Sequence, residues 1–166
     1  MKFYTGILIF FLSSLVICQP SVNSSATIKV KLIKSLKIEK VKGNLNFGEV
    51  ILNGAGQNLL KNPADGIEFL ILGHPEKEAV VSYQPALLYP DNQNTANTLL
   101  FLPAVFETGN NINFTTPQNV KNGTAVHLEN DDGTGVTFIW VGGKINVKAN
   151  QPEGDYKGIF TISVAY

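Results

Sequence analysis

Two histidines, His74 and His127, are the side chains of this sequence best suited to acid–base chemistry. An imidazole can act as the base that activates a serine, threonine or cysteine nucleophile in a hydrolase. The nucleophile-elbow pattern G-x-S-x-G does not occur in the sequence. We therefore expect both histidines to lie at the surface or rim of the fold. A hydrolase that uses one of them is a competing hypothesis, but we predict no catalytic residue.

The densest group of oxygen ligands is the sequence ENDD at residues 129–132, which Gly133 follows. Calcium binds oxygen ligands from Asp- and Asn-rich loops, but this spacing does not match the EF-hand loop. Asp-Asp-Gly is instead typical of a solvated turn. A zinc site built from Cys and His is excluded because the chain has one cysteine and two histidines. We expect a turn here and predict neither a metal site nor a cofactor.

Aromatic side chains could stack on sugar rings, which is the chemistry of a carbohydrate-binding module. Such a module would present an exposed row drawn from Tyr83, Tyr89, Phe106, Phe114 and Trp140. Trp140 and Tyr156, however, share strand parity with apolar neighbours, which favours packing in a core. A secreted carbohydrate-binding module is therefore kept as the alternative function.

Charge and composition exclude some classes of protein. Thirteen basic residues, all of them lysine, balance thirteen acidic residues. A nucleic-acid-binding protein normally has a basic surplus and uses the bidentate arginine side chain, so we predict no nucleic-acid partner. A length of 166 residues with 44% hydrophobic residues indicates one domain with a core of its own.

The N-terminus has the layout of a secretory signal peptide. Lys2 precedes an apolar run at residues 6–17, and small polar residues follow. The run is shorter than the roughly 20 residues of a membrane-spanning helix. We predict a signal peptide at residues 1–18, cleavage between residues 18 and 26, no stable membrane span afterwards, and a secreted, periplasmic or outer-surface protein.

Cys18 leaves two alternatives open, lipidation or removal with the signal peptide. The large Ile17 before it does not fit the usual lipoprotein pattern. If Cys18 is removed, the mature chain has no cysteine, and burial without disulfides must hold the fold.

After residue 26 the hydrophobic pattern has the period of two that is typical of strands. In residues 26–39, Ile28, Val30, Leu32, Leu36 and Ile38 alternate with polar residues, mostly lysines, and Lys34 breaks the apolar face. Further strands are predicted at residues 45–51, 67–71, 79–83, 98–105, 125–128, 136–141, 144–148 and 155–166. Gly142 and Gly143 favour a hairpin between two of them. The pattern predicts an all-β, immunoglobulin-like antiparallel sandwich of about 7–10 strands, forming one domain over residues 26–166.

Charge is unevenly distributed along the predicted strands. Residues 27–42 contain six lysines and one acid, whereas residues 43–166 contain six lysines and twelve acids. Two interpretations are open. Opposite charges across neighbouring strands stabilise pairing, at roughly 0.2–1 kcal/mol per pair. Lysines also protect an exposed edge strand from aggregation.

Three blocks resemble a known bacterial family. They are ATIKV…LKIE (26–39) with LNFGEV (45–50), GIEFLILG (66–73), and IWVGGKINV…GDYKGIFTISVAY (139–166). The sequence resembles the family called domain of unknown function 4402, found in exported proteins. More distantly, its last strand is similar to pilin subunits and spore-coat-protein-U-like domains, although it lacks the disulfide common in pilins. The resemblance implies a sandwich domain and no catalytic residues.

We expect an exported, non-enzymatic protein with a structural or surface-adhesion role. The expected mechanism is strand addition, in which an extended segment pairs with a sheet edge through its main chain. The partners would be copies of the protein itself or sister subunits, and residues 26–38 are the candidate segment.

Overall fold

The computed structural model describes residues 27–91 and 95–166. The chain divides into two units, Met1–Lys31 and Leu32–Tyr166, and each is described by itself. In the first unit, residues 27–31 form no regular element, and Ile28 and Val30 are exposed. The predicted signal peptide, Cys18 and the predicted cleavage region up to residue 26 lie outside the described residues. No helix among the described residues is long and apolar enough to cross a membrane.

The described part of the second unit is built from eleven antiparallel strands and two short 3-10 helices. The strands are β1 (Lys37–Gly43), β2 (Gln57–Lys61), β3 (Ile67–Gly73), β4 (Lys77–Tyr83), β5 (Ala86–Pro90), β6 (Leu99–Glu107), β7 (Gln118–Asn119), β8 (Thr124–Asp131), β9 (Thr134–Val147), β10 (Tyr156–Lys157) and β11 (Ile162–Ala165). The 3-10 helices are η1 (Pro63–Asp65) and η2 (Thr95–Asn97). The predicted all-β antiparallel fold is confirmed. All strands belong to one hydrogen-bonded sheet, so an immunoglobulin-like sandwich of two layers stays a prediction.

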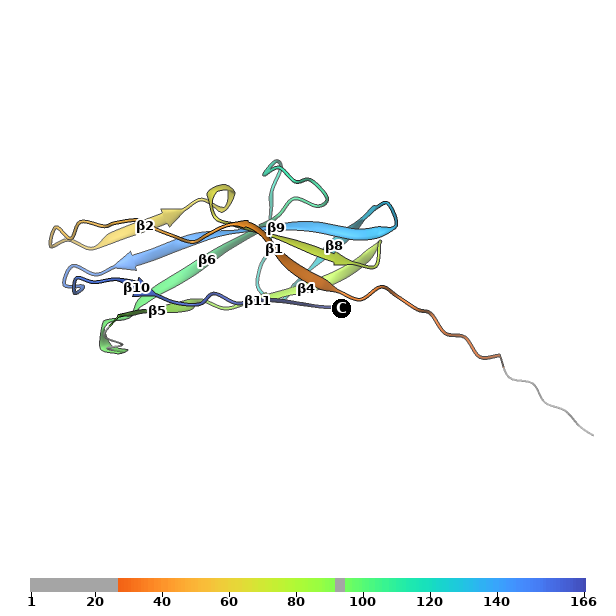
Figure 1. The fold of residues 1–166 in the computed structure, drawn as a ribbon, viewed down its shortest axis with the longest axis horizontal. Coiled ribbons are helices and arrows are strands. Elements are labelled where there is room, and N and C mark those ends of the chain that lie inside the picture. Colours follow the sequence, from red (N-terminus) through yellow and green to blue (C-terminus); the bar gives the residue numbers. More distant parts are fainter. Residues whose placement is uncertain (1–26, 92–94) are drawn as a thin grey trace, which may run out of the picture. The chain divides into compact units, whose positions relative to one another are not determined.

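The long strand β9 is the centre of this sheet (Figure 1). Along one edge it pairs first with β3 and then with β2, and along the other edge first with β8 and then with β6. Two rows of paired strands therefore share β9. One row is β2-β9-β6-β5-β10, and the other is β1-β3-β9-β8-β4-β11.

The sequence of β9 explains its central position, because apolar residues occupy both of its faces. Ile139 and Val141 are fully buried in a core cluster of the second row. Ile145 lies in a cluster of the first row, together with Phe101. Trp140 lies in a third cluster with Val136 and Phe138, as the parity of these residues predicts. A strand that packs on both faces is necessarily an interior strand.

The hairpin predicted at Gly142 and Gly143 is wrong, because β9 continues through both residues. A Cβ atom at Gly142 would lie 2.3 Å from the carbonyl oxygen of Lys61, and one at Gly143 would lie 2.4 Å from that of Leu102. Gly143 also has a φ of 147°, which few other residues adopt. The two glycines therefore permit close approach of neighbouring backbones rather than a turn.

Three other predicted strands differ from the structure. Residues 27–36 are not in a strand, and β1 begins only at Lys37. Residues 45–51 form no strand either. The predicted last strand is two short strands, β10 and β11, because residues 158–161 leave the pairing. At Gly158 a Cβ atom would lie 2.4 Å from the carbonyl oxygen of Leu87, so the chain there packs closely on β5 instead of continuing a ladder.

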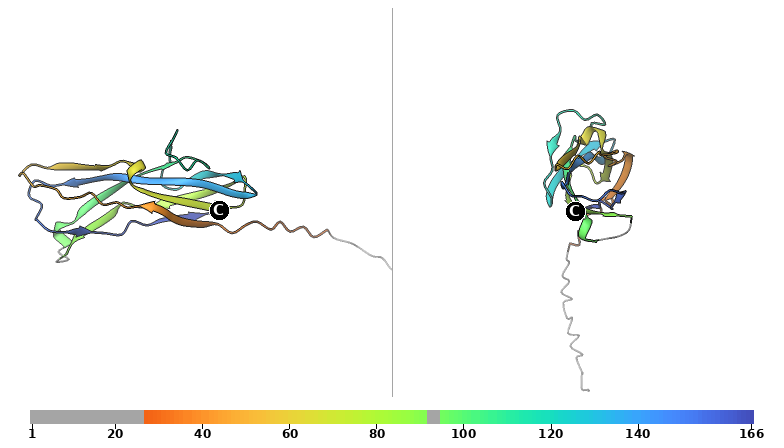
Figure 2. Two further views of the ribbon diagram at one scale, coloured as in Figure 1. Left: turned by 45° about the horizontal axis from the view of Figure 1, so that its top comes forward. Right: turned by 90° about the vertical axis from the view of Figure 1, so that its left-hand side faces the viewer.

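The sheet curls until β1 and β11 lie against each other (Figure 2). Leu36 and Ile38 on one side, and Ile162 and Val164 on the other, pack on the same core cluster. The hydroxyl of Tyr166 donates to the carbonyl oxygen of Lys34 at 2.8 Å and accepts from the main-chain N–H of His74 at 2.7 Å. We call this contact, defined by Leu36, Ile38, Ile162, Val164 and Tyr166, the closed seam.

Candidate functional site

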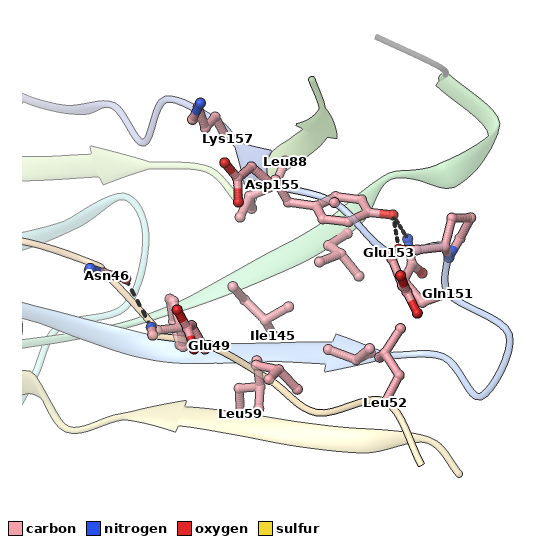
Figure 3. A pocket seen from close by; sticks show the side chains of 18 of the residues that line it. Asn46, Glu49, Leu52, Leu59, Leu88, Ile145, Gln151, Glu153, Asp155 and Lys157 are labelled. Carbon is pink, nitrogen blue, oxygen red and sulfur yellow. Dashed lines mark hydrogen bonds between the residues drawn. The ribbon is translucent and has the colours of Figure 1, made fainter. Parts of the chain in front are cut away.

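In the row that contains β2 and β10, the curled sheet leaves an opening. A hollow of about 780 Å³ lies between residues 45–52 and residues 151–157 (Figure 3). A second hollow, of about 270 Å³, shares four lining residues with the first and extends toward Phe160. We call the two hollows together the open cleft. Its floor is apolar and consists of Leu59, Leu88, Leu99, Ile145 and Val147.

The first rim of the open cleft, residues 44–52, is kept out of the sheet by its own side chains. The Asn44 side-chain oxygen accepts from the main-chain N–H of Asn46 at 3.0 Å, and the Asn46 side-chain oxygen accepts from the N–H of Gly48 at 2.9 Å. Such local bonds compete with strand pairing. Gly48 has a φ of 76°, outside the strand region. The rim therefore turns locally instead of forming the predicted strand.

The second rim, residues 151–157, is fixed by a buried amide. Gln151 is only 7% exposed. Its side-chain amide donates to the carbonyl oxygen of Asn97 at 2.8 Å and to the hydroxyl of Tyr156 at 2.9 Å. That hydroxyl donates in turn to the carbonyl oxygen of Pro152 at 2.8 Å. These linked hydrogen bonds hold the rim in position.

Three carboxylates, those of Glu49, Glu153 and Asp155, line the open cleft (Figure 3). None of them forms an ion pair within the residues that the structure describes. Lys157 also lines the cleft, but its ammonium group is paired with Asp91 at 3.1 Å. An apolar floor below an acidic rim is suited to an extended ligand that carries apolar and basic groups.

Neither histidine lines the open cleft. His127 is exposed, and its Nε2 lies 3.3 Å from a carboxylate oxygen of Glu76. His74 is half-buried at the closed seam, where its main-chain N–H donates a hydrogen bond to the Tyr166 hydroxyl. The surface or rim position predicted for the two histidines is thus confirmed for His127, while the predicted lack of a catalytic role stays a prediction.

The acidic stretch at residues 129–132 ends β8, and the predicted turn to β9 is made by Asp132 and Gly133. Asp132 and Gly133 have positive φ values of 45° and 74°, and the main-chain N–H of Gly133 donates to the side-chain oxygen of Asn130 at 2.9 Å. Across the described ranges, 27–91 and 95–166, no group of three or more His, Cys, Asp and Glu residues is placed to hold a metal ion.

Glu107 is a titratable group that sequence reasoning missed. It is half-buried on β6. Burial raises the pKa of Glu107, a hydrogen bond from the Thr137 hydroxyl at 3.4 Å lowers it, and the nearby charges of Glu129 and His127 act in opposite directions. The only signal in the sequence was an acid at the end of an apolar strand, which does not distinguish it from surface acids.

The five candidate aromatic residues do not form a row of exposed rings. Trp140 is 4% exposed, as its parity predicted. Phe114 packs edge-on against Trp140 and Phe106, with ring centroids 5.4 and 6.1 Å apart. Tyr83 donates to the carbonyl oxygen of Val120 at 2.7 Å, and Tyr89 is 39% exposed. Sugar binding by these residues stays a prediction.

The open cleft was also missed, because its rims come from segments far apart in the chain. The sequence did give two local signals, which were Gly48 within the apolar residues 45–51 and Gly158 within the terminal strand. Each glycine marks a point at which a predicted strand leaves the sheet.

The fold and the cleft define an all-β, antiparallel domain whose curled sheet is closed at one place and open at another. The chain belongs to the family described as domain of unknown function DUF4402, whose model matches residues 36–166. This confirms the family resemblance inferred from the sequence blocks. The comparison with curated proteins found no match.

Proposed function

We propose that this protein is an exported, non-enzymatic structural subunit that acts at the cell surface or outside the cell. Its copies associate through strand addition by residues 27–33. The rest of the predicted segment 26–38 is not available for this, because Lys37 and Ile38 pair with β3 and Lys34 and Leu36 contact the same sheet, while residue 26 lies outside the described residues. One observation carries the proposal. Ile28, Val30 and Leu32 share one strand parity, are 93%, 82% and 84% exposed, and lie outside every strand of the described residues.

The free energy of burial favours a partner for this segment. An apolar side chain of this size contributes about 1.5–3 kcal/mol when it moves from water into a packed site. Alternation of apolar and polar residues is the pattern that allows one face of a strand to be buried while the other stays wet. A segment with this pattern and no partner in its own sheet is suited to pair with another molecule.

The test of this proposal uses the protein recovered after export from an expressing bacterium. Intact mass will locate its N-terminus, which we expect between residues 18 and 26. Light scattering over a concentration series should show masses above that of a monomer. The variant I28S/V30S should weaken association at least about a hundredfold, because it removes about 3–6 kcal/mol of burial.

The matched control is I112S, which changes another exposed isoleucine (57%) in a loop. It should leave association unchanged. Retention of the precursor in the cell would contradict export. A protein that stays monomeric at every concentration, or one that associates equally well as I28S/V30S, would contradict strand addition.

A further inference from the structure

The open cleft has unpaired main chain on both of its sides. No hydrogen bond joins the main chain of Phe47, Glu49 or Val50 to another described residue. The same holds for Ile159 and Phe160 on the opposite side. Unpaired N–H and C=O groups beside an apolar floor are what an additional strand needs in order to bind.

The side chains of the cleft are complementary to those of residues 27–33, both in their apolar surfaces and in their opposite charges. The apolar floor is complementary to the face formed by Ile28, Val30 and Leu32. The opposite face of this segment carries Lys29 and Lys31. The rims of the cleft carry the unpaired acids Glu49, Glu153 and Asp155. If this segment lay on the floor as a strand, Lys29 and Lys31 would point outward, between the acids of the two rims.

The copy that carries the cleft cannot fill it with its own Leu32. The ammonium group of Lys34 donates to the carbonyl oxygen of Gly133 at 2.7 Å and to the Thr134 hydroxyl at 3.0 Å, where β9 begins. The floor residue Ile145 lies near the other end of β9, about 36 Å away at the usual strand rise. Leu32 is two residues from Lys34, a span of only about 7 Å.

From these observations we propose that the open cleft binds residues 27–33 of a second copy of this chain. The incoming segment lies as an extra strand between residues 44–52 and residues 151–160. Ile28, Val30 and Leu32 lie on the apolar floor, and Lys29 and Lys31 face the acidic rims. This inference rests on the proposed function, because it names the acceptor for the segment that the function requires.

Reversing the charges of the cleft tests the acceptor, and reversing the charges of residues 27–33 tests the donor. The variants E49K/E153K and K29E/K31E should each weaken self-association about tenfold, because two attractive contacts become repulsive. An equimolar mixture of the two variants should regain association. The control E78K/K121E reverses one acid and one lysine that do not line the cleft and should behave as the unchanged protein. Circular dichroism and thermal unfolding will show whether each variant is folded.

Cross-linking gives a second measurement that does not depend on charge. One preparation carries C18S/K31C and the other C18S/E153C, and a short bismaleimide should join them into a mixed dimer. The matched control replaces E153C by E78C and should give little mixed product. This experiment remains informative if E49K/E153K fails to fold.

The outcomes distinguish the two proposals. Loss and rescue by the charge variants, with a mixed cross-link, support the open cleft as acceptor. Association that I28S/V30S abolishes but E49K/E153K leaves intact, without a cross-link at E153C, overturns the cleft and leaves the proposed function standing. A protein that does not associate at all overturns both.

Discussion

The closed seam and the open cleft are two places where the same curled sheet meets itself, and they differ in what the chain supplies. At the closed seam, Leu36 and Ile38 meet Ile162 and Val164 over a fully buried core. At the open cleft, the facing segments also supply apolar side chains, such as Phe47 and Phe160, which both pack against Phe101. Their Asn- and Gly-rich turns and unpaired acids nevertheless leave a hollow between them. Main-chain pairing joins neither pair of margins in the described part of the chain. The comparison teaches that apolar side chains from both margins are not sufficient for closure, because the turns and acids of the cleft margins leave an opening.

The largest expected effect on the free energy of unfolding comes from adding a side chain at Gly73, beneath the closed seam. A Cβ atom at Gly73 would lie 2.7 Å from both the Tyr166 hydroxyl oxygen and a methyl carbon of Leu128, and 3.0 Å from a methyl carbon of Leu36. We expect G73V to lower the free energy of unfolding by about 3 kcal/mol, because overpacking displaces these side chains. Urea unfolding followed by circular dichroism will measure it. An unchanged midpoint would show that the seam adjusts freely and is not a packed contact.

A matched pair of truncations compares the two places directly. Ile162 at the closed seam and Leu52 at the open cleft are both partly buried. We expect I162A to cost about 2 kcal/mol and L52A less than about 1 kcal/mol, because Ile162 packs on the larger buried cluster, whereas Leu52 borders the hollow and leaves less of a new cavity. Thermal and urea unfolding of the monomeric protein at low concentration will give both values. Equal losses would mean that the cleft is as well packed as the seam.

The smallest effect concerns pH and lies outside both places. Burial raises the pKa of Glu107 above its value in the unfolded chain, so the folded state favours the protonated form. The contribution of this group is present at low pH and is lost as the pH rises through the raised pKa. The variant E107Q should flatten that part of the stability profile while leaving self-association unchanged. If E107Q and the unchanged protein have the same dependence of stability on pH, Glu107 does not cause that dependence.

Period-two alternation was sufficient to predict the all-β class and the strands that became β3, β4, β6 and β8. It failed where tertiary contacts decide the outcome. Gly142 and Gly143 look like a turn in the sequence, yet they serve the close approach of Lys61 and Leu102. Residues 27–36 have the pattern of a strand but no neighbour to pair with in the described residues. The open cleft escaped prediction because its rims are about a hundred residues apart, a separation that local patterns do not bridge.

The attachment of Lys34 at the beginning of β9, with the floor of the cleft near its end, has a consequence for any array that these copies build. Each copy has one donor segment and one cleft, so two copies can exchange segments as a two-fold pair, or the contacts can continue head to tail as a fibre or a ring. A fibre would have polarity, with a vacant acceptor on its first member and a free lysine-rich arm on its last. The addition of further copies, and the molecules able to stop it, would then differ between the two ends of the fibre.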